Sequence, residues 1–496
     1  MARTCCLLGL LVCVTAGAVQ SIQSAFAGGS PECFAVGAAI LRERGPEGLA
    51  EALASGERLK QRRASLQQTI AKLEREIQSG AATHEAKSAK PSNPEEALAN
   101  ARQQLAYLDR QQEWWSESID QIGAQRGCRV SRLYWYTDLD KAKAEAARTG
   151  RPILSLRMLG KLTDEYSCAN SRFFRTALYS NSAISDYLRD HFVLHWQSVR
   201  PVPQVTIDFG DGRKLKRTLT GNSAHYVLAA GGEPLDVLPG LYAPQHFFHW
   251  LHRMNKFHSR YMAAEEVERA AMLAQFHSDR RREVYRQWAD DVRQLGDEEL
   301  TLVTARIDRA IASERKAGGT SPLAAAASRL SFTKMQAETP LLRFANFSGP
   351  FIEASMDDAM WRRIAALHRD GVKLDKASVH LMRAEFPKAA VAGRLAVTKS
   401  VQEDPLLRVV RLFEDSMALD TVRNEYVLHR RIHEQFADAA AQTANVDALN
   451  EWVYAELFLT PSGDPWLGLA PPDVYTALEN DGRTEPEERV AERSGG

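Results

Sequence analysis

A single loop cysteine, Cys168, is the residue best placed to carry out chemistry. It stands in the run Ser-Cys-Ala-Asn-Ser-Arg-Phe-Phe, between a short aliphatic segment and a helical pattern. A thiolate before a helix is stabilised by the helix N-terminus, and Arg172 and Arg175 would add positive charge on the next turn. Such a thiol could capture a client cysteine as a mixed disulfide. Tyr166 and Phe173, however, also predict an apolar surrounding, in which the thiol would be buried and inert.

A second pattern of possible chemical use lies near the C-terminus. Glu425, His429 and His433 recur every four residues and would share one stripe of a helix, where they could offer nitrogen and oxygen ligands to zinc or iron. The His-Glu-x-x-His order of metalloproteases is missing. Pairing of Glu and His at this spacing on a helix surface also explains the pattern. We therefore expect no metal and no cofactor, and name these three residues as the alternative.

The N-terminus has the form of a cleavable export signal. Residues 1–27 contain Arg3, an apolar run and Ala25-Phe26-Ala27 before Gly28. The apolar run is shorter than the roughly 20 residues that a spanning helix needs, so we expect no integral membrane segment in the mature chain. The protein is then periplasmic or extracellular.

Removal of this signal leaves three cysteines, Cys33, Cys128 and Cys168. An odd number in an oxidising compartment predicts one structural disulfide and one free thiol. The alternative is that none of them is paired.

The segment between the first two cysteines decides which pair is expected. Two runs with leucines and isoleucines at heptad spacing, Pro46–Ser79 and Pro94–Gln125, flank a small, polar, Pro-containing stretch. They predict an antiparallel helical hairpin, or coiled coil, over residues 33–128. Because the arms are nearly equal in length, the residues outside them meet. We therefore expect a disulfide between Cys33 and Cys128.

Residues 129–258 predict a mixed α/β unit around the loop cysteine. The expected order is an Ala-rich helix at 138–149, a strand from 152, the Cys168 loop, a helix, and a strand at 191–199. Alternating runs on either side of Gly-Asp-Gly and of Gly-Gly then predict two hairpins, of which the first, at 204–220, is an insertion. An aromatic-faced helix at 244–257 closes the unit.

This order resembles the thioredoxin-like superfamily, in its exported branch, over about residues 135–257. The matching residues are Trp135, Asp138, Ala142 to Ala147, Gly150–Leu154, Cys168-Ala169-Asn170-Ser171, Phe192-Val193 and Tyr226–Pro234. The resemblance implies a thioredoxin-like fold with a degenerate Cys-x-x-Ser motif.

Two departures from the family pattern bear on activity. The family's second cysteine falls on Ser171, which cannot resolve a mixed disulfide, and its cis-proline falls near Ser223-Ala224, where no proline exists. Dithiol redox catalysis is therefore not expected. We interpret the chain as an exported binding or scaffolding protein of the cell envelope that binds a protein partner. A monothiol thiol–disulfide factor acting through Cys168 is the alternative, and the only enzymatic one.

The rest of the chain predicts helices over residues 259–475 and a charged, disordered tail over 476–496. The fold class expected is thus multi-domain α+β: helical hairpin, thioredoxin-like domain with an inserted β-hairpin, and helical C-terminal region. Lys and Arg number 63, as do Asp and Glu, so the formal net charge is zero. A neutral, exported chain is not expected to bind nucleic acid.

Overall fold

The computed structural model describes most of the chain from residue 31 onward. The described residues are 31–79, 93–219, 221–296, 298, 301, 305, 356–385, 405–438 and 445–467. The predicted export signal and the predicted tail lie outside them. Within the described part, no helix combines the length and the apolar character needed to cross a bilayer.

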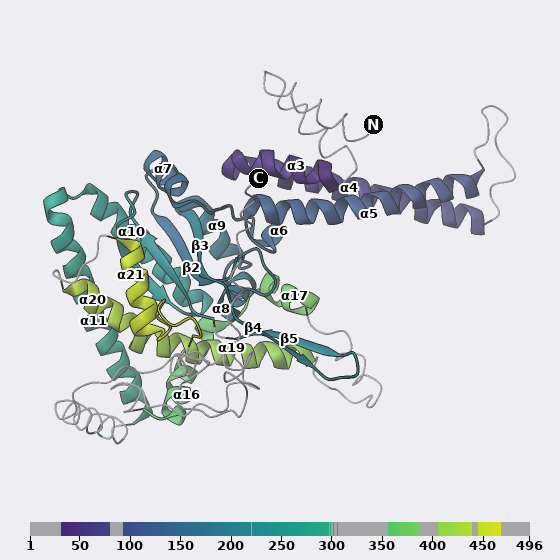
Figure 1. Ribbon diagram of the computed structural model, residues 1–496. Helices are drawn as coiled ribbons and strands as arrows, with labels where there is room; N and C mark the ends of the chain where they lie inside the picture. The colour runs from purple at the N-terminus through teal and green to yellow at the C-terminus, as the bar shows by residue number, and fades with distance from the viewer. Residues whose placement is uncertain are drawn as a thin grey trace, which may run out of the picture.

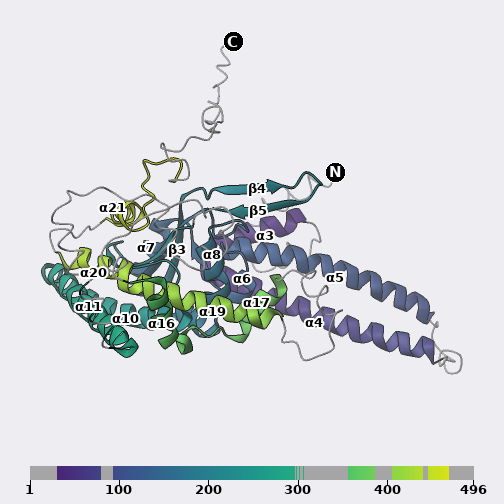
Figure 2. The ribbon, with the colours of Figure 1, turned by 90° about the horizontal axis from the view of Figure 1, so that it is seen from below.

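Two long antiparallel helices, α4 (Gly45–Gln78) and α5 (Pro94–Gly123), form the predicted hairpin. They lie side by side and project away from the rest of the protein (Figures 1 and 2). Asn93 caps α5 by accepting a hydrogen bond from the Glu95 amide, and Pro94 suits the first helical turn. At the base of the hairpin, helix α3 (Pro31–Glu43) packs against both arms.

The contact between the two arms depends on one glycine. The indole of Trp115 lies directly over Gly56, where a Cβ atom would come within 1.9 Å of the ring. The indole nitrogen donates a hydrogen bond of 3.0 Å to the carbonyl of Ala52, one turn earlier. Only glycine at this position lets the two helices approach so closely.

Next along the chain is a five-stranded mixed sheet with the order β1-β3-β2-β6-β7. The first three strands in this order are parallel, and β2, β6 and β7 pair antiparallel. The elements that build this region are α6 (Cys128–Ser131), β1 (Trp135–Tyr136), α7 (Leu139–Thr149), β2 (Ile153–Leu159), α8 (Ala169–Phe173), the π-helix η2 (Phe174–Leu178), α9 (Ser182–His191), β3 (Val193–Arg200), β6 (Ser223–Leu228) and β7 (Pro234–Pro239). Strands β2, β6 and β7 are buried throughout, as expected for strands covered on both faces.

The inserted hairpin forms a separate two-stranded sheet, β4 (Gln204–Asp208) and β5 (Lys214–Thr218). It lies outside the main sheet (Figure 2). Its alternating sequence and the Gly-Asp-Gly turn account for it, as predicted.

The C-terminal region is helical, as predicted, and packs around the edge strand β7. Helix α10 (Pro244–Ala263) corresponds to the aromatic-faced helix expected to close the α/β unit. The elements after it are α11 (Glu266–Leu295), α16 (Asp358–Leu367), the 3-10 helix η3 (Arg369–Val372), α17 (Lys376–Glu385), α19 (Pro405–Arg423), the π-helix η4 (Asn424–His429), α20 (Arg430–Ala437), α21 (Val446–Trp452) and the π-helix η5 (Val453–Leu457). The sequence pattern predicts two separate helices here, Pro405–Met417 and Leu419–Ala441. The chain is instead helical without interruption from 405 to 437, because Met417, Ala418 and Leu419 are helix formers that contain no stop signal.

One hydrophobic core joins the sheet to the C-terminal helices. It runs from Ala124 to Phe458 and includes Trp135 of the sheet, Trp250 of α10 and Ile432 of α20. The edge strand β7 contacts η4 and α20, so its free side is covered by helices. The structure confirms an α+β protein that is rich in helix and contains a mixed sheet. The boundary expected between residues 258 and 259 stays a prediction.

Candidate functional site

The predicted stripe of Glu425, His429 and His433 is present and fully inside the protein. Glu425 and His429 lie in the π-helix η4 and His433 lies one turn later in α20. Glu425 is 6% exposed and both histidines are 0% exposed. Because these side chains are buried, the stripe faces the core and not solvent, which excludes a pairing of Glu and His on the helix surface. The π-helical turn is a further indication, since such turns within α-helices occur frequently at functional sites.

The imidazole of His429 lies between two carboxylates. Its Nδ1 is 2.8 Å from Glu425 Oε2, and its Nε2 is 3.2 Å from each carboxylate oxygen of Asp236 on β7. A carboxylate only accepts, so both ring nitrogens donate and the ring is an imidazolium. Burial opposes this charge, but Asp236 and Glu425 outweigh it and raise the pKa of His429 to about 9.

Asp236 is a buried charge whose hydrogen bonds are satisfied. Besides His429, it accepts a hydrogen bond of 2.9 Å from the indole of Trp250 and one of 2.8 Å from the amide of Val237. Burial favours its protonated form, yet the charge of His429 outweighs burial and lowers its pKa. Removing His429 would leave the charge of Asp236 buried without compensation, which is costly.

A pair of neutral histidines lies next to this ion pair. His277 of α11 and His433 approach through their Nδ1 atoms at 2.9 Å, and His277 Nε2 is 2.8 Å from the carbonyl oxygen of Leu235. Burial lowers the pKa of His277 to about 4 and that of His433 well below its usual range. Asp236, His277 and His433 each offer one ligand atom within 4.8 Å of the other two. Among the described residues, they are the one group of three or more possible metal ligands that lie this close together.

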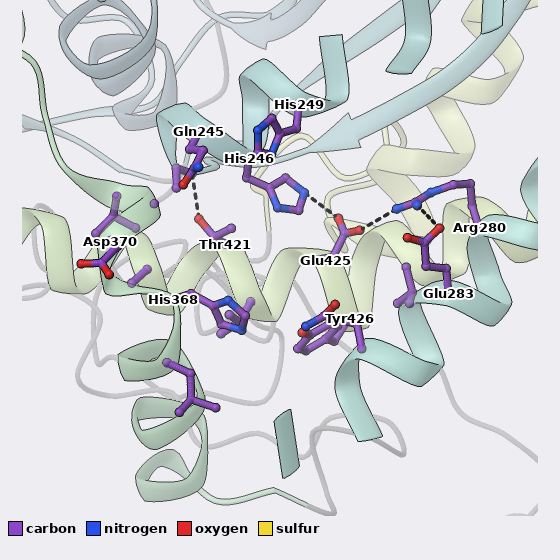
Figure 3. Close-up of a pocket in the computed structure, with 18 residues that line it drawn as sticks. Gln245, His246, His249, Arg280, Glu283, His368, Asp370, Thr421, Glu425 and Tyr426 are labelled. Carbon is purple, nitrogen blue, oxygen red and sulfur yellow. Dashed lines mark hydrogen bonds and ion pairs between the residues drawn. The ribbon is translucent and has the colours of Figure 1, made fainter. Parts of the chain in front are cut away.

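The carboxylate of Glu425 connects this cluster to a cavity of about 430 Å³. His246 of α10 meets Glu425 Oε2 at 3.2 Å, and the guanidinium of Arg280 of α11 lies 3.7 Å from Oε1 (Figure 3). Glu283 pairs with Arg280 on the same wall. The cavity is lined by Ala243, Gln245, His246, His249, Arg280, Glu283, Val284, Gln287, Leu367, His368, Asp370, Gly371, Val372, Ala418, Thr421, Val422, Glu425 and Tyr426.

A second hydrogen-bonded group forms part of the cavity wall. Buried Asp291 accepts from the hydroxyl of Tyr426 and lies 2.6 Å from His368 Nε2. Burial and the charge of Asp291 raise the pKa of Tyr426, which stays a neutral donor. The cavity wall thus carries fixed hydrogen-bond donors and acceptors, together with side chains of positive and of negative charge.

Cys168, the leading candidate from the sequence, is closed to solvent. It caps α8, accepts a hydrogen bond of 3.4 Å from the Ser171 amide, and its Sγ lies 2.9 Å from the hydroxyl of Ser223. Both Cys168 and Ser171 are 0% exposed. The Ser171 hydroxyl donates to Ser167 and to the Cys168 carbonyl. No partner molecule can reach this thiol without local opening.

The second cysteine of the predicted disulfide is also buried. Cys128 is a free cysteine in the structure, and its thiol donates to the carbonyl of Leu133 at 3.4 Å. The side chain of Cys33 lies outside the described residues. The expected pairing is therefore not formed at Cys128 in the structure, and it stays a prediction that peptide mapping can decide.

Sequence reasoning missed two members of the buried cluster, although both leave a signal. Asp236 is the one charged residue of the buried strand Pro234–Pro239. His277 occupies a core-facing position of α11, in phase with Leu273, Val284 and Trp288. A charged or titratable residue at a position that the periodicity assigns to the core is a site candidate.

Comparison of the chain with protein-family models, with curated proteins and with solved structures finds no match.

Proposed function

We propose that the chain is an exported binding protein, built on a thioredoxin-like domain without dithiol redox chemistry, with its ligand site in the cavity beside Glu425. The strand order β1-β3-β2-β6-β7 and the position of Cys168 after β2 support the thioredoxin-like assignment. Ser223 opposite Cys168 supports it further, because the resemblance places the cis-proline of the family near this residue.

The observation that carries the proposal is the closed thiol position. Thiol exchange requires an accessible thiolate and, for turnover, a resolving thiol. Cys168 is fully buried, and the serine that replaces the second cysteine is fully buried and hydrogen-bonded. Both features favour a domain that serves as a scaffold over the monothiol alternative.

The cavity supports binding of a small polar molecule. Its wall includes the carboxylate of Glu425, which the buried His429 holds in place by a hydrogen bond. His246 and Arg280, which also line the cavity, contact the same carboxylate. Groups fixed by their neighbours lose little freedom when a ligand binds, which favours affinity. Because the wall has side chains of both charges, it would suit a ligand that itself carries a positive and a negative group.

The helical hairpin is the part that suits a protein partner. Exposed ion pairs link its arms, between Arg63 and Asp109 and between Arg102 and Glu74. The two helices extend well beyond the core (Figure 2). Such an arm supplies no cavity but offers a long surface. We assign it to contact with an envelope protein, as an antiparallel coiled coil.

Two measurements on the purified full chain test the proposal. Alkylation of Cys168 by iodoacetamide should be slow in the native state and fast after denaturation, and the protein should not catalyse insulin reduction. Native mass spectrometry after incubation with an extract of polar metabolites should show a small-molecule adduct. His246→Ala should weaken that adduct, whereas Arg213→Ala on the remote β4–β5 hairpin should not.

The opposite results would support the alternative. Fast alkylation of native protein, with mixed disulfides in cells that disappear in Cys168→Ser, would identify a monothiol factor. Absence of an adduct in every fraction of the extract would overturn the assignment of the cavity.

A further inference from the structure

The buried pair His277 and His433, behind the cavity, leaves one of its two nitrogen lone pairs without a hydrogen to accept. The carbonyl of Leu235 can only accept, so His277 Nε2 carries the hydrogen and its Nδ1 is a bare lone pair. The single hydrogen between the two Nδ1 atoms then belongs to His433. His433 Nε2 is left as a second lone pair, and it is a buried nitrogen with no hydrogen-bond partner in the structure.

Burial of an acceptor without a partner costs free energy. His225 Nδ1 and His258 Nε2 are also without a partner in the structure, but of these histidines His433 is the one that lies beside a second histidine and a carboxylate within ligand distance. Three imidazole nitrogens share one hydrogen, and the negatively charged Asp236 lies next to them. The arrangement leaves one nitrogen lone pair without a hydrogen to accept. A bound metal ion would accept nitrogen lone pairs of this group.

We propose that Asp236, His277 and His433 form a binding site for a divalent transition-metal ion, with Zn²⁺ as the ion that fits best. Two imidazole nitrogens and one carboxylate oxygen are donors that zinc takes, whereas Mg²⁺ and Ca²⁺ prefer oxygen ligands alone. This site is distinct from the cavity and does not depend on the proposed ligand-binding function.

The surroundings already have the form of an outer ligand shell. A histidine that binds a metal typically donates its other N–H to a carbonyl or carboxylate, as His277 does to Leu235. Asp236 is oriented by the N–H groups of Trp250 and Val237. These contacts fix two of the three ligands before any ion arrives.

Binding through both Nδ1 atoms requires the hydrogen of His433 to move from Nδ1 to Nε2, together with a small rearrangement of the ligands. Zinc–nitrogen bonds of about 2.0–2.1 Å place two ligand nitrogens roughly 3.3 Å apart in a tetrahedron. The two Nδ1 atoms are 2.9 Å apart, and the three ligand atoms lie within 4.8 Å of one another. His429 shares the oxygens of Asp236, so the ion would compete with it for one of them.

The three ligands come from elements that are distant in sequence but packed together. Asp236 lies on β7, His277 on α11 and His433 on α20, and both α11 and β7 contact α20. A metal ion would therefore tie the sheet to the helical region, and the expected consequence is higher stability of the whole core.

The test uses untagged full-length protein, stripped with a chelator and then titrated. Zn²⁺ should bind at one ion per chain and raise the thermal unfolding midpoint. Co²⁺ should bind at the same site and give the visible absorption of a tetrahedral complex. His433→Ala and His277→Ala should each lower the affinity for Zn²⁺ by more than the roughly 10–100-fold that loss of an outer-shell partner costs.

His258→Ala is the matched control, because His258 is also a buried histidine but lies outside the cluster. It should leave metal binding unchanged. If a ligand variant fails to fold, the stoichiometry and the Co²⁺ spectrum of the unmodified protein still decide. Absence of a tetrahedral Co²⁺ spectrum, or zinc binding that His433→Ala does not weaken, would overturn the proposal.

Discussion

Acid should destabilise the sheet through His225, which is completely buried in β6. Its Nε2 lies 2.7 Å from the hydroxyl of Tyr179, and its ring packs against Phe174 and Phe247. Burial lowers the pKa of His225 to about 3. The native state therefore holds the ring neutral where the unfolded chain, with its ordinary pKa of about 6.5, binds a proton.

The sign of the effect follows from linkage. A group whose pKa is lower in the folded state contributes stability above its unfolded pKa, and this contribution is lost as the pH falls from about 6.5 towards about 3. At about pH 5, the unfolded state gains about 2 kcal/mol from protonating this one histidine while the native state gains almost nothing. At about pH 7.5 the difference is close to zero.

The experiment compares His225→Gln with the unmodified chain. Urea unfolding, followed by near-UV circular dichroism at about pH 7.5 and about pH 5, should show that the variant loses about 2 kcal/mol less than the unmodified protein on acidification. The other buried histidines are present in both proteins and cancel. His249→Gln, at an exposed position, should keep the full pH dependence.

Equal losses of free energy in His225→Gln and in the unmodified protein would refute the reasoning. That result would mean that His225 takes up a proton in the native state, and so that β6 is not closed to water.

The remaining predictions concern the helical hairpin. Gly56→Ala should lower the thermal stability of the hairpin, because a Cβ atom within 1.9 Å of the Trp115 ring costs about 1–3 kcal/mol of overpacking, more than the roughly 0.5–1 kcal/mol gained by removing a glycine from a helix. Gly463→Ala, with no atom within 4 Å of the new Cβ, is the control, and equal melting curves for the two variants would contradict the packing. Non-reducing peptide mapping of protein recovered from an oxidising compartment should find Cys33 linked to Cys128. Recovery of both as free thiols would show that the prediction from equal arms is wrong.

The local pattern of the chain accounts for most of the elements. Heptad leucines and the polar break between residues 80 and 93 predict the two arms of the hairpin, and α4 and α5 end within two residues of the expected positions. Alternating runs around Gly-Asp-Gly predict β4 and β5 because a strand has a period of two. These features depend on neighbours in sequence, so sequence alone determines them.

The contact between Glu425 and His429 is also a feature that sequence alone determines. Residues four apart on a helix are neighbours, and the two side chains do meet at 2.8 Å. Sequence could not reveal which way the stripe faces, however. The expected surface pairing is instead a buried ion pair, since α19 and α20 form one continuous helix that packs on β7.

The partners that give this stripe its chemistry were decided by tertiary structure alone. Asp236 is 193 residues from His429, and His277 is 156 residues from His433. No periodicity connects positions so far apart, because they meet only where the edge strand of the sheet is covered by two helices. Sequence supplied the titratable side chains at core-facing positions, and packing of β7, α11 and α20 brought them within bonding distance.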